Sequence, residues 1–216
     1  MCKNLTELVF ILDASGSMAD LVDDTIGGFN SMIERQRREP GEALVSTVLF
    51  DDESRVIHDR VPLRRVEPLT RAQYAPDGYT ALLDAVGGAI RHIGGIHKRA
   101  RAEDRPARTL FVITTDGMEN ASRRYGYAQI KEMIERQKHR FDWEFLFLGA
   151  NIDAAASAAR IGIGAERAAN YHCDAEGTRL NYEVLGETVC RFRENAPIGS
   201  AWAERIRRDF KARSKR

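Results

Sequence analysis

The chain has 216 residues and is almost neutral, with 33 Lys and Arg against 32 Asp and Glu. This length predicts one sizeable domain with a full core, and 43% hydrophobic with 30% charged residues is typical of a globular protein in water. The even charge balance favours no particular class of partner. Three scattered cysteines are too few for a disulfide framework and predict a reducing, cytoplasmic location, with Cys173 and Cys190 interpreted as packed thiols.

The chain contains no segment of the kind that crosses a membrane. Its longest early apolar run, Leu8–Leu12, is far shorter than a membrane span, and no small-residue cleavage site follows it. We therefore expect neither a signal peptide nor a membrane anchor.

The first half of the chain predicts three strands and two helices. The continuous apolar runs Leu8–Leu12 and Ala43–Phe50 are typical of strands buried on both faces of a sheet. The run Ser54–Pro62 is more polar and follows a turn-like acidic segment, which predicts the antiparallel edge strand of a hairpin. Apolar residues recur at helical spacing over residues 22–33 and 80–94. The inward-facing residues of these two helices are Val22, Ile26, Phe29, Ile33, Leu83, Val86, Ile90 and Ile93.

The second half continues the same alternation of strands and helices. Leu110–Thr114 and Phe145–Leu148 are apolar strands, and Ala168–His172 is a final short strand. Three more helices are expected at Tyr127–His139, Asp153–Arg160 and Leu180–Phe192. Their inward-facing residues are Tyr127, Ile130, Ile134, Val184, Leu185 and Val189.

This order of elements, with long crossovers, predicts an α/β fold. We expect a doubly wound, mostly parallel sheet of about six strands, with one antiparallel edge strand and helices on both faces. No internal repeat and no long linker interrupts the pattern. We therefore expect one domain over residues 1–196, followed by a basic C-terminal helix or tail over residues 197–216.

The tail carries seven Lys and Arg against two acids. Trp202, Ile206 and Phe210 lie four residues apart and form one apolar stripe of a helix. We interpret the tail as a terminal helix that docks by this stripe and leaves its basic face in solvent. The alternative is contact with an anionic partner or a membrane surface.

Three side chains with oxygen atoms follow the first strand at alternate positions: Asp13, Ser15 and Ser17. A strand directs alternate side chains to one side, and the intervening Gly16 allows a tight loop, so the three oxygens can converge. Carboxylate and hydroxyl oxygens bind hard divalent cations, whereas zinc or copper favours His or Cys. The alternative is a helix N-cap, where Ser and Asp are also favoured.

Two further oxygen-bearing side chains stand at the same edge of the predicted sheet. Thr80 opens a helix, and Asp116 follows an apolar strand. If the strands that end in Asp13 and Asp116 are neighbours, all five oxygens meet beyond the carboxyl ends of the strands. The alternatives are an N-cap role for Thr80 and an Asp-Gly turn for Asp116, and both are compatible with metal binding.

Several polar residues near this edge have structural interpretations. Glu119, Asn120 and Ser122 are interpreted as a polar loop, with a role at the rim of the site as the alternative. Asp153 is expected to be the N-cap of its helix. Asp84 lies one turn into its helix, where the helix dipole favours an acid, and is interpreted as structural. The five histidines show no spacing typical of metal ligands.

Three motifs together resemble a von Willebrand factor type A (vWA) domain that carries a metal-ion-dependent adhesion site. They are D-A-S-G-S-M at 13–18, G-Y-T-A-L-L-D-A-V at 78–86 and F-V-I-T-T-D-G at 111–117. The motifs occur in the right order, and the resemblance covers residues 5–195. The stretch W-E-F-L-F-L-G-A-N-I-D at 143–153 is similar to the fifth strand of small, stand-alone bacterial members.

The resemblance implies that Ser15, Ser17 and Thr80 bind a divalent cation through their hydroxyls, while Asp13 and Asp116 hold coordinating waters or bind directly. Mg²⁺ is the expected ion, with Mn²⁺ or Ca²⁺ as alternatives. One coordination position stays open for the Asp or Glu of a partner protein. The implied function is a metal-dependent protein-binding module for adhesion or scaffolding, without catalytic residues.

Two other functions compete with this one. A Mg²⁺-dependent phosphotransferase or phosphatase would use Asp13 as the nucleophile and needs a general acid two residues on, where this chain has Ser15. A phosphate-binding loop of the G-x-x-x-x-G-K type is also absent from the sequence. A nucleic-acid binder would use the tail, but the sequence indicates no folded basic face with aromatic platforms. We therefore expect neither an enzyme nor a nucleic-acid partner.

Overall fold

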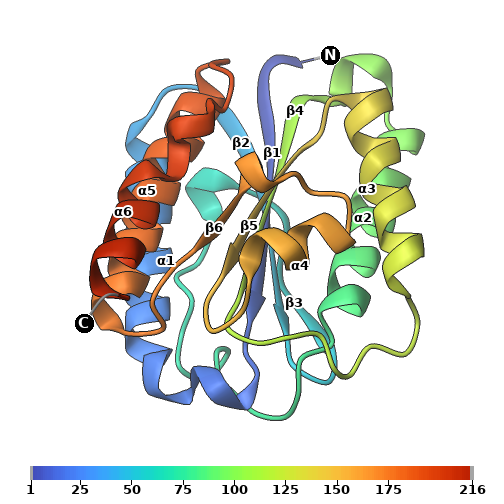
Figure 1. The fold of residues 1–216 in the computed structure, drawn as a ribbon. Coiled ribbons are helices and arrows are strands. Elements are labelled where there is room, and N and C mark those ends of the chain that lie inside the picture. The colour runs from blue at the N-terminus through green and yellow to red at the C-terminus, as the bar shows by residue number, and fades with distance from the viewer. Residues whose placement is uncertain (1, 215–216) are drawn as a thin grey trace.

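A six-stranded sheet forms the centre of the structure, a computed structural model that describes residues 2–214 and the side chains of residues 5–214. The strands lie in the order β3-β2-β1-β4-β5-β6, and each neighbouring pair is parallel except β2 with β3 (Figure 1). The predicted α/β architecture is confirmed. The strands are β1 (Cys2–Asp13), β2 (Glu42–Phe50), β3 (Ser54–Pro62), β4 (Pro106–Thr115), β5 (Glu144–Gly149) and β6 (Ala168–Asn170).

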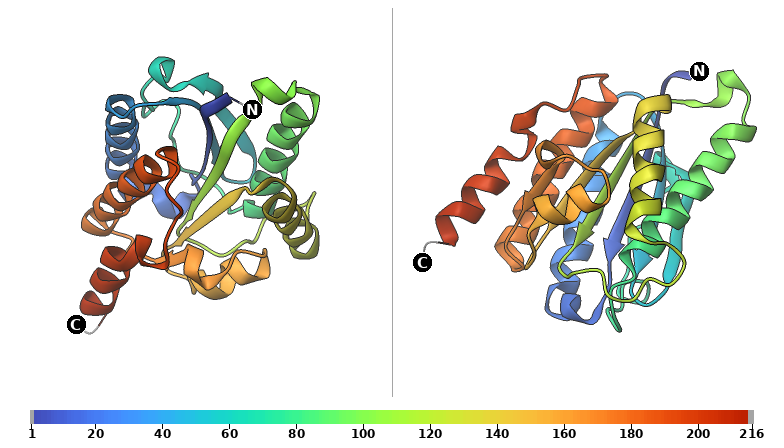
Figure 2. Two further views of the ribbon diagram at one scale, coloured as in Figure 1. Left: turned by 90° about the horizontal axis from the view of Figure 1, so that it is seen from above. Right: turned by 45° about the vertical axis from the view of Figure 1, so that its right-hand side comes forward.

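Helices cover both faces of this sheet. They are α1 (Val22–Arg38), α2 (Leu82–Arg99), α3 (Tyr127–Phe141), α4 (Ala154–Arg160), α5 (Ala175–Arg193) and α6 (Glu204–Arg213). Figure 2 shows α1, α5 and α6 on one side of the sheet and α2 with α3 on the other. The sheet divides the hydrophobic core into two halves, one on each face. The buried alanines of α4 belong to the half that packs against α2 and α3.

Strand β1 supplies side chains to both halves of the core. Leu8, Phe10 and Leu12 pack toward α1 and α5, whereas Val9 and Ile11 pack toward α2 and α3. Burial of each such side chain stabilises the fold by about 1.5–3 kcal/mol. The continuous apolar run therefore places β1 at the centre of the sheet, and its carboxyl end at the middle of one edge.

The C-terminal helix docks on this scaffold by its apolar stripe. Ile206 is 1% exposed, and α6 contacts α5 and β6. Trp202 donates its indole N–H to the carbonyl of Glu166, at 2.8 Å. Arg205 forms ion pairs with Glu183 and Glu187 of α5, so part of the basic face is neutralised within the protein. The docked-helix interpretation is confirmed for residues up to 214, and the last two residues of the predicted tail lie outside the described part.

Among the described residues, no helix combines the length and the apolar character that crossing a bilayer requires.

Candidate metal centre

The carboxyl ends of β1 and β4 lie side by side at the centre of the sheet. The two strands pair in parallel with Leu12 opposite Thr114, so Asp13 at the end of β1 and Asp116 just after β4 reach the same edge. The chain leaves β1 toward β2 on one side and β4 continues toward β5 on the other, which makes this the switch point of the sheet. Both carboxylates are almost fully buried, at 2% and 3% exposure.

The Asp13 carboxylate is held by two hydrogen bonds. The backbone N–H of Ser15 donates to Oδ1 at 2.8 Å, and the hydroxyl of Thr115 donates to Oδ2 at 2.6 Å. Burial raises the pKa of Asp13, these hydrogen bonds oppose that rise, and the charge of Asp116 adds to it. A buried carboxylate of this kind is stabilised by a nearby cation.

The two serines of the first motif form a chain of oxygens that leads to Asp116. The Ser15 and Ser17 hydroxyl oxygens are 3.3 Å apart, and Ser17 donates to Oδ1 of Asp116 at 2.7 Å. Ser15 is the N-cap residue of a short 3₁₀ helix, Gly16–Leu21, but its side chain makes no capping hydrogen bond. The N-cap interpretation therefore does not account for the Ser15 hydroxyl.

Thr80 lies beside the residue that follows Asp116. A Cβ atom built on Gly117 would be 3.5 Å from the Thr80 hydroxyl oxygen. Thr80 and Asn120 are joined by two hydrogen bonds, from the Thr80 N–H to the Asn120 side chain at 2.9 Å and from the Asn120 N–H to the Thr80 carbonyl at 3.1 Å. Helix α2 begins at Leu82 with Ala81 as its N-cap residue, so the N-cap role considered as the alternative for Thr80 is wrong. Thr80 is 4% exposed, and within the described part of the chain its hydroxyl makes no hydrogen bond.

Backbone contacts fasten the loop after β1 to the loop before α2. Gly16 donates its N–H to the carbonyl of Gly78 at 3.2 Å, and Asp77 donates to the carbonyl of Ala14 at 3.0 Å. Gly78 has a φ of +66°, and a Cβ there would lie 2.3 Å from a carboxylate oxygen of Asp52. Glycine is therefore favoured at position 78, because a side chain there would be strained by the positive φ and would displace the Asp52 carboxylate.

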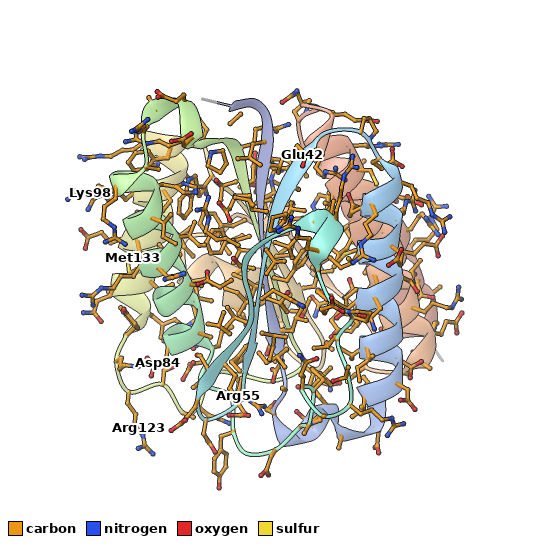
Figure 3. The ribbon with its side chains drawn as sticks, turned by 180° about the vertical axis from the view of Figure 1, so that it is seen from behind. Glu42, Arg55, Asp84, Lys98, Arg123 and Met133 are labelled. Carbon is orange, nitrogen blue, oxygen red and sulfur yellow. The ribbon has the colours of Figure 1, made fainter. Side chains whose placement is uncertain are left out.

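The loop from 117 to 126 is fixed to the start of α2 by two acids. Asp84 accepts the backbone N–H groups of Arg123, Arg124 and Tyr125 at 2.9–3.0 Å, and Figure 3 shows Asp84 next to this loop. Burial acts to raise the pKa of Asp84, but the three N–H donors and the Arg124 charge outweigh it and lower that pKa. The structural interpretation of Asp84 is confirmed.

Glu119 makes the reciprocal contact with the helix. Its carboxylate accepts the N–H of Leu83 at 2.9 Å and both the N–H and the hydroxyl of Ser122. Glu119, Asn120 and Ser122 therefore form the polar loop that the sequence predicts, and Asn120 also holds Thr80, which the sequence did not predict. Asp153 is the N-cap of α4 and accepts the N–H of Ala156 at 2.9 Å, which is also as predicted.

For two residues near the site, no role there was predicted from the sequence. Thr115, which holds Asp13, precedes Asp116 directly and could have been noticed by its position at the strand end. Cys173 lies after β6, half-buried, with its sulfur 3.7 Å from Oδ2 of Asp116. Burial, followed by the Asp116 charge, raises the Cys173 pKa to about 11. The packed-thiol interpretation is confirmed for Cys190, which is 8% exposed, and Cys173 also packs against the core, half-buried, in addition to its contact with Asp116.

The donor set fits a hard divalent cation. Among the described side chains there is no cluster of three or more His, Cys, Asp or Glu, so a site here depends on hydroxyl oxygens together with two carboxylates. Two ligands at right angles around Mg²⁺ lie about 3 Å apart. The 3.3 Å separation of the Ser15 and Ser17 oxygens is close to that value.

Comparison with known proteins gives matches in structure but not in sequence. No protein-family model matches the chain, and neither does any curated protein. A von Willebrand factor type A structure from Catenulispora acidiphila is 12% identical, with a TM-score of 0.56 over 86% of this chain and 42% of that chain. The chain has the vWA fold.

Other vWA-fold matches include metal-containing structures. Proximal thread matrix protein 1 from the mussel byssus, with a zinc-occupied MIDAS motif, is 14% identical, with a TM-score of 0.60 over 88% of this chain and 46% of that one. Manganese-loaded TRAP protein of Plasmodium vivax is 15% identical, with a TM-score of 0.55 over 83% of this chain and 73% of that one. This chain spans about half the length of the byssus protein chains, at 46% and 47%.

Proposed function

We propose that this chain is a non-catalytic binding module that depends on a divalent cation. Ser15, Ser17 and Thr80 contribute hydroxyl ligands, and Asp13 and Asp116 hold coordinating waters or bind directly. Mg²⁺ is the proposed ion, with Mn²⁺ or Ca²⁺ as alternatives. When bound, the ion supplies an electrophilic centre with a position open to an Asp or Glu side chain of a partner protein.

The observation that carries this proposal is that hydroxyls converge on the two buried carboxylates without a capping role. The Thr80 hydroxyl makes no hydrogen bond among the described residues. The Ser15 hydroxyl does not cap its 3₁₀ helix and instead lies 3.3 Å from the Ser17 oxygen, which itself donates to Asp116. This arrangement of oxygens supports a shared cation.

The surroundings of Asp13 do not favour the phosphotransferase alternative. Both of its carboxylate oxygens accept hydrogen bonds, from Ser15 and Thr115. Among the described residues, no Lys or Arg forms an ion pair with Asp13 or Asp116, whereas phosphoryl transfer uses cationic groups to stabilise the transferred phosphate. A p-nitrophenyl phosphate assay with Mg²⁺ tests this alternative, and turnover that disappears in Asp13→Asn would support it.

Thermal unfolding in EDTA and in millimolar Mg²⁺ or Mn²⁺ tests the metal site. An ion at 100 times its Kd stabilises the folded state by about 2.7 kcal/mol, which raises the Tm of a chain of this size by about 5–10 °C. We expect Asp116→Asn to abolish this increase. Asp142→Asn is the matched control, because Asp142 is exposed at the C-terminal end of α3, and it should retain the full increase.

The role of the partner carboxylate requires a second experiment. A captured partner should be released by chelator, and replacing its contacting Asp or Glu by Asn or Gln should prevent capture even with Mg²⁺ present. Capture that is unaffected by chelator in the wild type and in Asp116→Asn would contradict a metal-mediated contact.

We further propose that residues 1–196 carry this function as a small, stand-alone module of the bacterial type in the cytoplasm, with residues 197–216 as an accessory basic helix. Cys173 and Cys190 are both free, which supports a reducing location. Cell fractionation with a thiol-trapping reagent tests this placement.

A further inference from the structure

A groove between α2 and α3 lies at the opposite end of the sheet from the metal centre. Its cavity volume is about 550 Å³, within the range of small-molecule sites. Pro106 and Ala107, at the start of β4, contribute to its lining, whereas Asp116 follows the end of that strand. Thr109 also lines the groove, and the seven residues of β4 and its end that lead from Thr109 to Asp116 separate the groove from the metal centre by about 20 Å, so the groove belongs to a different site.

The floor of the groove is apolar, and there is room for it because α2 has a glycine, Gly94, where it faces α3. A Cβ built on Gly94 would meet only the Gln137 amide and the Trp143 ring, at 3.7 and 3.8 Å. Ile90 and Met133 line the groove alongside Trp143, and Figure 3 labels Met133 on the side of the molecule where α2 and α3 lie. The volume that a larger residue at position 94 would occupy is part of the groove.

The rim of the groove is strongly cationic. Five cationic side chains line it, against the single acid Asp142: Arg91, Lys98, Arg105, Arg136 and Arg140. All except Arg105 are exposed, and none of the five forms an ion pair among the described residues. Figure 3 shows Lys98 on α2 at the side of the molecule. By contrast, Arg205 and Arg213 of α6 each pair with two or more acids.

From this combination we infer that the groove binds a small organic anion with a flat apolar body. The apolar body would lie over Gly94 and Trp143, and the anionic group would face Arg136 and Arg140, since guanidinium groups match carboxylate, sulfonate and phosphate oxygens. Phe141, which is 54% exposed at the same rim, would be covered by the ligand. A nucleoside monophosphate and an aromatic carboxylate share this chemistry.

Anilinonaphthalene sulfonate, a fluorescent aromatic anion, is the probe. The chain has two tryptophans, so Trp202→Phe leaves Trp143 as a reporter inside the groove. We expect saturable probe fluorescence with matched quenching of Trp143. Uncharged phenylnaphthylamine, which has the same rings without the sulfonate, should bind at least tenfold more weakly. Adenosine monophosphate and naphthoate are added as competitors. The one that displaces the probe shows whether the groove binds a nucleoside monophosphate or an aromatic carboxylate.

Two variants and their controls complete the test. The double variant Arg136→Glu with Arg140→Glu should weaken probe binding at least tenfold, while Arg38→Glu, an exposed arginine in the last turn of α1, should not. Gly94→Leu should fill the groove and abolish Trp143 quenching, while Gly88→Leu, at a position of α2 with open space around its Cβ, should leave quenching intact.

The charge variant changes only exposed side chains and therefore tests the proposal even if Gly94→Leu does not fold. Probe binding that is absent, that is equal for the uncharged analogue, or that is unchanged in the charge variant would overturn the proposal. Displacement by neither competitor, but only by an acidic peptide, would also overturn it, because the occupant would then be a protein segment.

Discussion

Ser17 donates a 2.7 Å hydrogen bond to Oδ1 of Asp116, although the two residues are 99 positions apart in the chain. They meet because β1 and β4 are adjacent parallel strands whose carboxyl ends share one edge of the sheet. Through this contact, the Ser17 hydroxyl and the Asp116 carboxylate have a hydrogen-bond partner without a bound cation. A cation that binds between them must therefore replace a hydrogen bond, and the loss of that bond lowers the net affinity for the metal.

Asp13→Asn should have opposite effects with and without metal. The pKa of Asp13 is raised, chiefly by burial, so its ionisation weakens folding as the pH rises from the ordinary Asp range through the raised value. Asn retains the acceptor for the Ser15 N–H, and the Thr115 hydroxyl can donate to the Gly117 carbonyl, 3.1 Å away. In EDTA at pH 7 the variant should be at least as stable as the wild type in urea unfolding.

In millimolar Mg²⁺ the same variant should lose most of the stabilisation of about 2–3 kcal/mol expected for the wild type. A variant that is less stable in EDTA by more than about 1 kcal/mol would show that Asp13 stabilises the fold without a cation.

Thr80→Val removes a hydroxyl that makes no hydrogen bond among the described residues. Its cost in EDTA should therefore be below about 0.5 kcal/mol, while the Mg²⁺-induced increase in Tm should fall to less than half. Thr115→Val is the contrasting variant, since its hydroxyl donates to Asp13 at 2.6 Å. That change should cost about 1–3 kcal/mol even in EDTA. Equal costs for the two variants would refute the distinction between a metal ligand and a positioning residue.

Asp84→Asn tests the contact that holds the loop carrying Asn120 against α2. The pKa of Asp84 is below its ordinary value of 3.8, so its carboxylate stabilises the fold above that pH. This stabilisation is lost as the pH falls through the lowered value. We expect Asp84→Asn to cost about 2–3 kcal/mol at pH 7, because three N–H groups lose a charged acceptor. The difference from wild type should shrink as the pH falls from 3.8 through the lowered pKa, and a constant difference across this range would contradict the role of the charge.

Cys173 should react slowly with alkylating reagents despite being only half-buried. Its pKa of about 11 leaves very little thiolate at pH 8. Because thiolate is the reactive form, iodoacetamide should modify it on the order of a hundredfold more slowly than glutathione. Peptide mass spectrometry at several time points measures this rate. In Asp116→Asn the rate should rise, because one cause of the raised pKa is removed, and an unchanged rate would exclude the Asp116 contact as a cause.

Strand bounds were predicted best from the sequence where the order of apolar and polar residues follows burial alone. The edge strand Ser54–Pro62 has the predicted bounds, but β1 begins several residues before Leu8. The reason is Glu7, which is fully buried and pairs with Arg60 and His97, so the apolar pattern ends before the strand does. A charge buried by distant partners cannot be recognised from local periodicity.

Helix ends depended on contacts that a local pattern does not contain. Helix α5 begins at Ala175, before the predicted Leu180, because Asp174 caps it by accepting the N–H of Gly177. The last strand stops at Asn170, two residues before its predicted end, and the following segment brings Cys173 to Asp116. Cys173 was missed because its position depends on how β6 and α5 are connected in space.

The candidate site itself was predicted from spacing and strand order. The alternate positions of Asp13, Ser15 and Ser17 required only strand geometry, and their approach to Asp116 required only that β1 and β4 be neighbours. The details around Thr80 were not predicted, because the cap of α2 comes from Glu119 in a later loop.

Anomalous scattering from a crystal of the protein soaked in Mn²⁺ locates the cation. We expect one strong peak within coordination distance of the hydroxyl oxygens of Ser15, Ser17 and Thr80, with Asp13 and Asp116 contacting the ion directly or through water. We also expect the peak to disappear in crystals of Asp116→Asn. A fully occupied manganese bound elsewhere, with the Ser17–Asp116 hydrogen bond intact and no peak at this edge of the sheet, would contradict the proposed metal centre.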